Sequence, residues 1–322
     1  MMEDLVIANS NMSDVDVLLC YELDDSHGWD DNDFELTVPL STSIPYGHYL
    51  YRAETDCGGI VDARRVVSNA SGKKVVYKGR TWQGILAGKV LSPDSGQDYL
   101  TYSGDLNTII AYVISRTGLG GVFVASSELA GTSASGRFDR YANAYTALRK
   151  VCRSKSHRLR IRKLSPGLVE LAAVPLTVHE LDSDHCMFDI EENRRPVNHL
   201  ICLGKGELSN RTVLHLFADE AGNVSTTQTL FGVDEVTEVY DYSSADSADL
   251  QQKGIERLSG YQESDSCDID LANGQGYEID DKVHVTDVDT GVEITAAVSQ
   301  VVVEVDECGL ETVSYEVGNV TF

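Results

Sequence analysis

The spacing of apolar residues changes halfway along the stretch Lys74-Val-Val-Tyr-Lys-Gly-Arg-Thr-Trp-Gln-Gly-Ile-Leu-Ala-Gly-Lys-Val-Leu91. This change decides the predicted fold of the segments on either side. The first part of the stretch is a β-branched run that ends at Gly79 and predicts a strand. From Trp82 onward the apolar residues recur at spacings of three and four, which predicts a short helix that Thr81 caps. The stretch therefore predicts a strand that leads directly into a helix.

Two glycines, Gly84 and Gly88, lie one turn apart on this predicted helix. Each costs about 1 kcal/mol relative to alanine in a helix interior, so we expect another backbone to approach closely there. Two interpretations are open. Either the helix packs tightly on the sheet that precedes it, or the glycines form a helix-to-sheet joint at a contact between subunits.

With 42% hydrophobic and 24% charged residues the composition indicates a folded protein. A length of 322 residues is enough for two domains, and we expect three modules. No apolar run reaches the roughly 20 residues that span a bilayer, so we expect no membrane insertion by this chain. The acidic start Met-Met-Glu-Asp is unlike a signal peptide and predicts assembly in the cytoplasm. Seven singly placed cysteines predict reduced, mostly buried thiols.

The charge is strongly acidic: 26 basic against 51 acidic residues give a formal net charge of −25. Such a surface repels phosphate backbones and argues against a protein whose main task is to grip nucleic acid. It suits a wall along which nucleic acid slides without sticking, and it suits equally well a protein that is simply very soluble.

Residues 1–97 are predicted to form a small β barrel or sandwich closed by the helix described above. Val15, Val17 and Leu19 alternate as the apolar side of a first strand, and the acidic segment 24–33 is predicted as the exposed tip of a hairpin. The further predicted strands are 34–38, 49–53, 60–67 and 74–78, the last two joined by the turn Asn69-Ala-Ser-Gly72.

Residues 98–178 are predicted to form an α+β insert. An apolar stripe from Leu106 to Ile114 predicts a helix that Asp105 or Ser103 caps and Gly118 ends. A second helix is predicted along the side that carries Tyr141, Tyr145, Leu148 and Val151, followed by strands 157–164 and 168–173 turned by Ser165-Pro-Gly167.

Residues 179–322 return to strands, at 199–203, 212–217 and 236–242, with one helix predicted at 247–261. A β meander then runs from Val283 to Val317 with hairpin turns at 287–291 and 306–309. The fold class is therefore α+β and mostly β, with two barrel-like β modules and the α+β insert between them.

The insert reverses the charge of the chain, because nine basic and no acidic residues lie between Arg140 and Lys163. Arg158, Arg160 and Arg162 alternate with apolar residues and so share one face of a strand. Three interpretations are open: a solvated sheet face, docking against an acidic surface of a neighbouring subunit, or nucleic-acid binding. The absence of aromatic residues between these arginines argues against the last.

No motif predicts a catalytic, cofactor or metal site. Asp287-Val-Asp-Thr-Gly291 resembles the start of a calcium loop but lacks the later glutamate, so a hairpin turn is favoured. His179, His185 and Cys186 lack a second pair at zinc spacing. Gly118-Leu-Gly-Gly121 follows a helix and predicts a helix end. The sequence favours a protein that is not an enzyme, although its many carboxylates leave room for a catalytic pair.

Four segments carry a resemblance to a known family: Lys78-Gly-Arg-Thr-Trp-Gln-Gly-Ile-Leu-Ala-Gly-Lys-Val-Leu91, Ser103-Gly-Asp-Leu-Asn-Thr-Ile-Ile110, Tyr277-Glu-Ile-Asp-Asp-Lys-Val-His-Val285, and Ile294-Thr-Ala-Ala-Val-Ser-Gln-Val-Val302 with the ending Tyr315-Glu-Val-Gly318. In this order they resemble the tail hub proteins of long-tailed bacteriophages and prophages. These proteins are related to the hub at the centre of contractile baseplates. The resemblance extends over nearly the whole chain and rests on element order and loose motifs.

This resemblance implies a homotrimeric ring at the tail tip of the virion. Two β tube domains per chain, 1–97 and 179–322, would give six modules that match a hexameric tail tube, with the insert outside. The implied partners are the distal tail protein ring, the tape-measure protein and a tail fibre or spike, and DNA would pass through the lumen without specific binding. Many such hubs continue into a peptidase, lysozyme or fibre-like extension. Because this sequence ends at Phe322, we expect any such activity in another protein.

The predicted subunit-interface residues are Arg158, Arg160, Arg162, Gly84 and Gly88. Two other functions remain as alternatives to the structural hub: a tail module that binds host-surface glycans, and a cell-wall hydrolase that uses a carboxylate pair.

Overall fold

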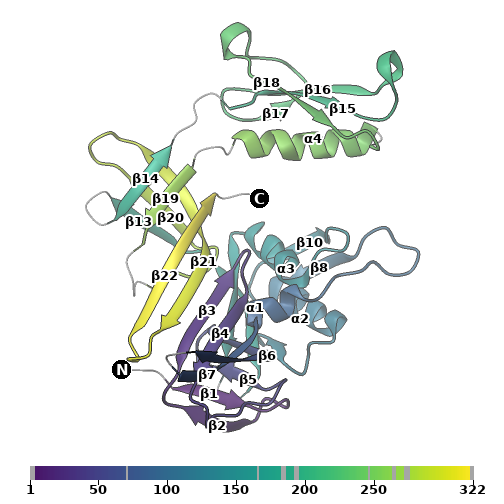
Figure 1. Cartoon of the computed structure of the whole chain (residues 1–322). Coiled ribbons are helices and arrows are strands. Elements are labelled where there is room, and N and C mark those ends of the chain that lie inside the picture. The colour runs from purple at the N-terminus through teal and green to yellow at the C-terminus, as the bar shows by residue number, and fades with distance from the viewer. Residues whose placement is uncertain are drawn as a thin grey trace. The chain divides into compact units, whose positions relative to one another are not determined.

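The computed structural model describes residues 4–69, 72–164, 167–182, 186–191, 196–245, 247–262, 266–271 and 276–319. These residues form two compact units (Figure 1). Unit 1 contains the described residues up to 187 and from 269 to 318, and unit 2 those from 188 to 268. None of the described helices is both long and apolar enough to cross a membrane.

A large sheet of eleven described strands dominates unit 1. From one edge to the other its order is β13 (Val178–Asp182), β20 (Lys282–Thr286), β21 (Glu293–Val305), β3 (Glu22–Gly28), β4 (Asp33–Val38), β7 (Gly72–Thr81), β6 (Gly58–Asn69), β5 (Tyr49–Tyr51), β1 (Leu5–Ala8) and β2 (Asp14–Leu18), with β22 (Glu311–Asn319) paired to β21. This order has two ends, so the described strands do not close into the barrel that the sequence predicted. The two turns between β6 and β7 and between β20 and β21 lie where they were expected, although residues 70 and 71 fall outside the described part of the chain.

The sheet joins the two ends of the sequence. β21 pairs antiparallel with β3, so that Val301 lies opposite His27 and Val305 opposite Leu23. The modules expected at 1–97 and 179–322 therefore share one sheet within unit 1, while part of the second module forms unit 2. Local apolar patterns predict strands but not which distant strands pair, and this explains the different grouping.

Two predictions about the first strands are wrong. The segment predicted as an exposed acidic tip contains β3, in which Leu23, Asp25 and His27 are buried at alternating positions. The apolar side of β2 is exposed instead, with Val15 55% and Val17 43% accessible. β3 does show the two-residue alternation of a half-buried strand, but two of its buried positions hold Asp25 and His27. These polar side chains can be buried because they bind each other.

The helix predicted after the strand β7 is α1 (Trp82–Ala87), and the Thr81 side chain accepts a hydrogen bond from the Gly84 amide as expected. Trp82 is fully buried, stacked on Tyr49 at 5.8 Å between ring centroids and edge-on to Phe123 at 6.4 Å. The helix thus joins the large sheet to the insert through one aromatic cluster.

The insert consists of two helices and two small sheets within unit 1. In order they are β8 (Thr101–Asp105), α2 (Leu106–Thr117), β9 (Phe123–Ala125), β10 (Ser133–Arg137), α3 (Ala144–Arg153), β11 (His157–Lys163) and β12 (Val169–Pro175). β8 pairs with β10, and β12 lies between β11 and β9. Asp105 caps α2, and Gly118 ends it with a positive φ of 70°, as predicted. The turn between β11 and β12 includes residues 165 and 166, which lie outside the described ranges.

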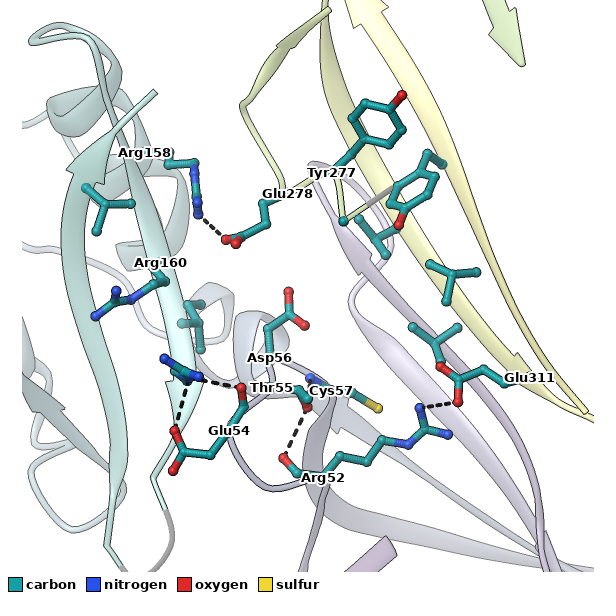
Figure 2. A pocket seen from close by; sticks show the side chains of 18 of the residues that line it. Arg52, Glu54, Thr55, Asp56, Cys57, Arg158, Arg160, Tyr277, Glu278 and Glu311 are labelled. Carbon is teal, nitrogen blue, oxygen red and sulfur yellow. Dashed lines mark hydrogen bonds and ion pairs between the residues drawn. The ribbon is translucent and has the colours of Figure 1, made fainter. Parts of the chain in front are cut away.

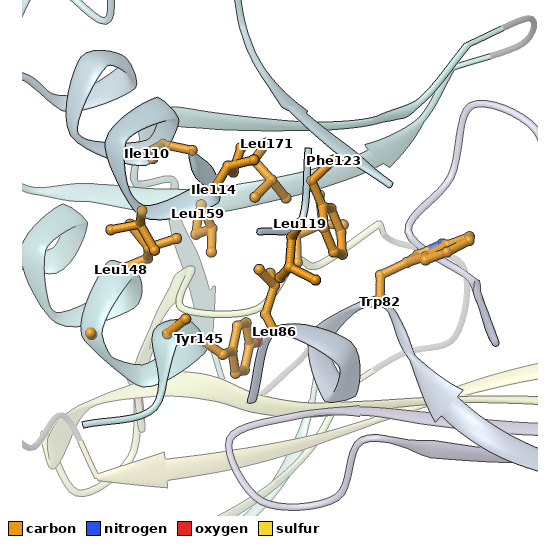
Figure 3. Close-up of a cluster of buried hydrophobic side chains, with 14 of the residues drawn as sticks. Trp82, Leu86, Ile110, Ile114, Leu119, Phe123, Tyr145, Leu148, Leu159 and Leu171 are labelled. Carbon is orange, nitrogen blue, oxygen red and sulfur yellow. The ribbon is translucent and has the colours of Figure 1, made fainter. Parts of the chain in front are cut away.

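The second insert helix begins later than predicted. Asn143 caps it by accepting from the Thr146 amide, while Tyr141 lies before it with φ near 60°, a conformation that no α-helix contains. The apolar sides of α1, α2 and α3 meet β11, β12 and β9 in one core, part of which Figure 3 shows around Leu86, Ile110, Phe123 and Leu171.

Unit 2 is a two-layer α/β unit. Its sheet has the order β17 (Val224–Ser225), β16 (Val213–Ala218), β15 (His199–Leu203) and β18 (Thr237–Asp241), with short 3₁₀ turns at Leu208–Asn210 and Gly232–Asp234. The predicted helix α4 (Ser247–Gln262) packs on one face of this sheet (Figure 1). Gly254 allows that contact, because a Cβ there would lie 2.6 Å from the Cys202 sulfur. β14 (Met187–Glu191) and β19 (Ser266–Asp270) pair with each other where the chain passes between the units.

Candidate functional site

The predicted interface glycines differ in their surroundings. Gly84 is buried in α1, and a Cβ added to it would lie 2.2 Å from the carbonyl oxygen of Asn32 in the β3–β4 turn. Gly88 follows the end of the helix, is exposed, and would hold a Cβ at 3.4 Å from its nearest neighbours. Gly88 is therefore the C-cap residue and not an interior position of the helix, and the close backbone contact at Gly84 is made within the chain.

The three predicted arginines lie on one face of β11, while Leu159 and Ile161 are buried on the other. Each arginine faces a carboxylate of unit 1. Arg158 pairs with Glu278 and, at 3.0 Å from Nε to Oδ1, with Asp281.

The two remaining arginines also have partners. Arg160 lies 2.8 Å from Glu170 on β12, and Arg162 Nε lies 3.1 Å from Glu54. Acidic partners of the kind that one of the three interpretations placed on a neighbouring subunit are thus present within the chain itself.

These arginines form one wall of a cleft of about 550 Å³ (Figure 2). Its floor is the apolar face of β21 and β22, and the loop after β5 forms another wall. The charged lining side chains balance in number: four arginines and four carboxylates, which are Arg52, Arg158, Arg160, Arg162, Glu54, Asp56, Glu278 and Glu311. A cleft whose charges are already paired does not attract a strongly charged ligand.

Arg52 anchors the loop after β5 to the cleft floor. It is 3% exposed, and its Nη1 lies 3.0 Å from Glu311 on β22. Burial disfavours its charge, but the neighbouring Cys57, Tyr21 and Glu311 raise its pKa further above the ordinary value. Arg52 therefore stays charged and holds β5 against β22.

A buried polar cluster that no sequence motif predicted lies behind this loop. His27 Nδ1 is 2.7 Å from Asp25 Oδ1, and His27 Nε2 is 3.2 Å from Asp56 Oδ2. Asp25 also accepts from the Cys57 thiol at 3.4 Å and from the Gly58 amide at 3.2 Å. The signal that could have revealed it was the alternation of Leu23, Asp25 and His27, because a period of two predicts that all three face the core.

The cluster does not have the electrostatics of a nucleophilic site. Burial, followed by the negative charge of Asp25, raises the pKa of the Cys57 thiol well above its ordinary value. A reactive cysteine needs the opposite, a pKa lowered by nearby positive charge. Cys57 therefore serves as a buried hydrogen-bond donor in this arrangement.

A second buried cluster connects the insert to the large sheet. Arg149 of α3 donates from Nε to Asp280 Oδ2 at 2.9 Å, and the indole of Trp29 donates to Asp280 Oδ1 at 3.1 Å. The Arg149 guanidinium also lies over the rings of Trp29 and Tyr145, at 5.2 and 5.3 Å from their centroids. Arg149 is thus held by a carboxylate and two aromatic faces.

The other segments considered from the sequence have structural roles. The Asp287 carboxylate accepts from the Thr290 amide at 3.0 Å and closes the β20–β21 hairpin turn, as predicted. His179 lies 3.5 Å from Asp281 and edge-on to Tyr277, whereas His185 lies outside the described residues. Within the described ranges, no three His, Cys, Asp or Glu side chains are placed to hold a metal ion.

Solved structures with a similar fold are known, although sequence comparisons find no match. No protein-family model matches the sequence, and no curated protein matches it. A tail protein from Neisseria meningitidis is similar in structure, with a TM-score of 0.54 and 12% identity over 98% of this chain and 95% of that chain. The prophage MuSo2 43 kDa tail protein from Shewanella oneidensis gives 0.56 and 12% over 98% of both chains.

A third solved structure, the P2 virion baseplate in its activated conformation, gives a TM-score of 0.53 and 11% identity over 98% of both chains. These matches extend over nearly the whole chain and confirm, at the level of the fold, the resemblance drawn from the sequence. The chain therefore has the fold of bacteriophage tail and baseplate proteins.

Proposed function

We propose that this chain is a structural subunit of a phage tail tip, where three copies form a hub that joins the hexameric tail tube to the tip. The observation that carries the proposal is the fold match over 98% of this chain to tail and baseplate proteins. The role is structural and not enzymatic. The chain assembles in the host cytoplasm and resides in the virion tail.

The open order of the large sheet supports a ring. β2 and β13 end the sheet, and neither has a second partner among the described strands. Exposed sheet edges invite pairing with another chain unless they are covered. In the proposed hub, neighbouring copies cover these edges, and residues 1–97 and 179–322 supply two tube modules per chain.

The charge of the chain supports DNA passage. A lumen lined by a protein of net charge −25 repels phosphates and lets DNA slide during ejection without specific binding. In this arrangement the insert lies outside the ring. The partners are the distal tail protein ring, the tape-measure protein, and a fibre or spike.

The five residues predicted from the sequence to lie at a subunit interface differ in how accessible they are. Arg160, Arg162 and Gly88 keep accessible surface, with the two arginine side chains 33% and 43% exposed, and we retain them as proposed subunit contacts. Arg158 and Gly84 are buried within the chain and would act by supporting the surface that carries the other three.

Negative-stain imaging of the purified chain tests the proposal. Threefold rings with a central channel are expected, and such rings should bind the distal tail protein of the same virion. Monodisperse single particles under all conditions would contradict it. Saturable binding of host glycans by such single particles would favour the glycan-binding alternative instead.

A further inference from the structure

The hairpin of β6 and β7 extends beyond its neighbours in the large sheet. β5 pairs with β6 only from Gly58 to Ile60, and β4 pairs with β7 only from Val75 to Arg80. Among the described strands, residues 63–68 therefore pair only with β7 and residues 72–74 only with β6, and their side chains are exposed or half-buried on both faces. We call these residues the basic arm.

The arm holds positive charge that the chain does not neutralise. It carries Arg64, Arg65, Lys73 and Lys74, and no acidic residue lies between Ala63 and Lys74. Lys74 pairs with Glu22 at 2.7 Å, whereas the other three make no ion pair within the described part of the chain. Among other exposed lysines, Lys150 and Lys253 have carboxylate partners, whereas Lys155 and Lys205 make no ion pair with a described residue. Crowded like charges are unfavourable unless an anionic surface faces them.

A complementary surface exists on β2, the last strand of the sheet. Asp14, Val15, Asp16 and Val17 all have exposed side chains. Asp14 accepts a hydrogen bond from the Tyr51 hydroxyl, and Asp16 accepts one from the Val17 amide, but neither makes an ion pair with another described residue. The outer edge of β2 has no partner among the described strands. This edge thus alternates acidic and apolar side chains.

We propose that the basic arm of one chain docks on the β2 edge of a second copy of the same chain. Three features of the two surfaces match: their charges are opposite, both present exposed valines, and both have unpaired strand edges. Val66 on the arm is 58% exposed, close to the exposure of Val15 on the partner edge. The apolar residues become buried when the strands meet, which adds to the ionic attraction.

The contact joins two different surfaces, and such head-to-tail contacts form closed rings when their rotation permits. The inference rests on the proposed function, since it names the contact that would hold the ring. A second copy fits this arm better than nucleic acid does. Its two arginines are followed directly by Val66 and Val67, which a protein surface can cover, and the acidic remainder of the chain repels phosphates.

Charge reversal in the full chain tests the contact. Arg64→Glu with Arg65→Glu lowers the net charge from −25 to −29, and the control pair Lys155→Glu with Lys205→Glu makes the same change at exposed lysines outside the arm. Sedimentation at 50 and 300 mM NaCl measures self-association. We expect the arm variant to weaken assembly at least tenfold at low salt, the control to leave it within twofold, and high salt to weaken the wild type.

The reciprocal change identifies the partner surface. Asp16→Lys should weaken assembly as the arm variant does, and Asp16→Lys combined with the arm variant should restore part of it, because the charges are then exchanged. Circular dichroism checks that each variant is folded.

The results that would contradict this contact differ from those that would contradict the proposed hub. Normal rings from the arm variant would overturn this contact while leaving the hub proposal intact. A wild-type chain that stays monomeric would overturn both. Duplex DNA binding that depends on the arm, with assembly unaffected by the reversal, would assign the arm to nucleic acid and overturn the docking inference.

Discussion

The Nδ1 atom of His27 lies 2.7 Å from the Oδ1 atom of Asp25, and both side chains are almost completely inaccessible. Burial opposes a charge on His27, but Asp56 and Asp25 outweigh it and raise the pKa of His27 from 6.5 to about 10. The same imidazolium lowers the pKa of Asp56 against the effect of burial. A buried cation therefore ties β3 to the loop that lines the cleft.

His27 is predicted to make stability pH-dependent. Because its pKa is higher in the folded state, its contribution is complete below about pH 6.5 and is lost as the pH rises through about 10. His27→Gln should lower the free energy of unfolding by roughly 3 kcal/mol at pH 6, since it leaves the buried carboxylate of Asp25 without its cation. The deficit relative to wild type should shrink steadily toward pH 10.

Urea unfolding between pH 6 and pH 10 measures this difference. His284→Gln is the control, because His284 lies on the same sheet with its side chain 28% exposed. A deficit of His27→Gln that is equal at both ends of the pH range would refute a charged His27.

The two predicted interface glycines should respond differently to alanine. Gly84→Ala places a Cβ 2.2 Å from a backbone carbonyl and should cost about 2 kcal/mol, even after the gain of about 1 kcal/mol in helix propensity. Gly88→Ala meets only ordinary contacts at 3.4 Å and should change stability by less than about 0.5 kcal/mol. Midpoints of guanidinium unfolding compare the two, and equal midpoints would show that α1 does not press against the β3–β4 turn.

Adjacent residues on α3 offer a matched test of buried and exposed ion pairs. Arg149 and Asp280 are 8% and 1% exposed, so Arg149→Met should cost about 3 kcal/mol, because the buried carboxylate of Asp280 loses its closest cation and keeps only the Trp29 indole and the Arg153 guanidinium at 3.7 Å. Lys150 and Asp139 are 61% and 68% exposed, so Lys150→Met should cost less than about 1 kcal/mol. Thermal unfolding of both variants decides the matter, and similar losses would contradict the anchoring role of Arg149.

Cys57 should be inert in the folded chain. Burial and the charge of Asp25 hold the pKa of its thiol well above the ordinary value, so little thiolate forms at pH 8. Iodoacetamide should modify the exposed Cys20 and Cys308 but leave Cys57 unmodified until urea is added. Peptide mass spectrometry follows each site, and labelling of native Cys57 at the rate of Cys20 would call for a nucleophilic role instead.

Local features of this fold were predictable from the sequence because local chemistry decides them. Thr81 and Asp105 cap their helices, and Gly118 ends α2, each through a contact with residues within the next or previous turn. The alternation of Arg158 to Arg162 predicted correctly which side of β11 faces the core.

Pairings between distant parts of the chain were not predictable in this way. Nothing near Arg158 indicates that Glu278 is its partner, and nothing near His27 indicates that Val301 lies opposite it. The candidate cleft depends on such pairings, so the sequence supplied one of its walls but neither its floor nor the buried cluster behind it. The segment 24–33 was predicted to be exposed because it is acidic. Asp25 in this segment is buried instead, because His27 and Cys57 bind its carboxylate.

Sedimentation equilibrium of the purified full-length chain tests the central claim, which is that three copies assemble as a tail-tip hub. We expect a species of about 106 kDa, three times the chain mass of 35.2 kDa, that becomes more populated as protein concentration rises. A single 35.2 kDa species up to the highest soluble concentration, at low and high salt alike, would contradict it.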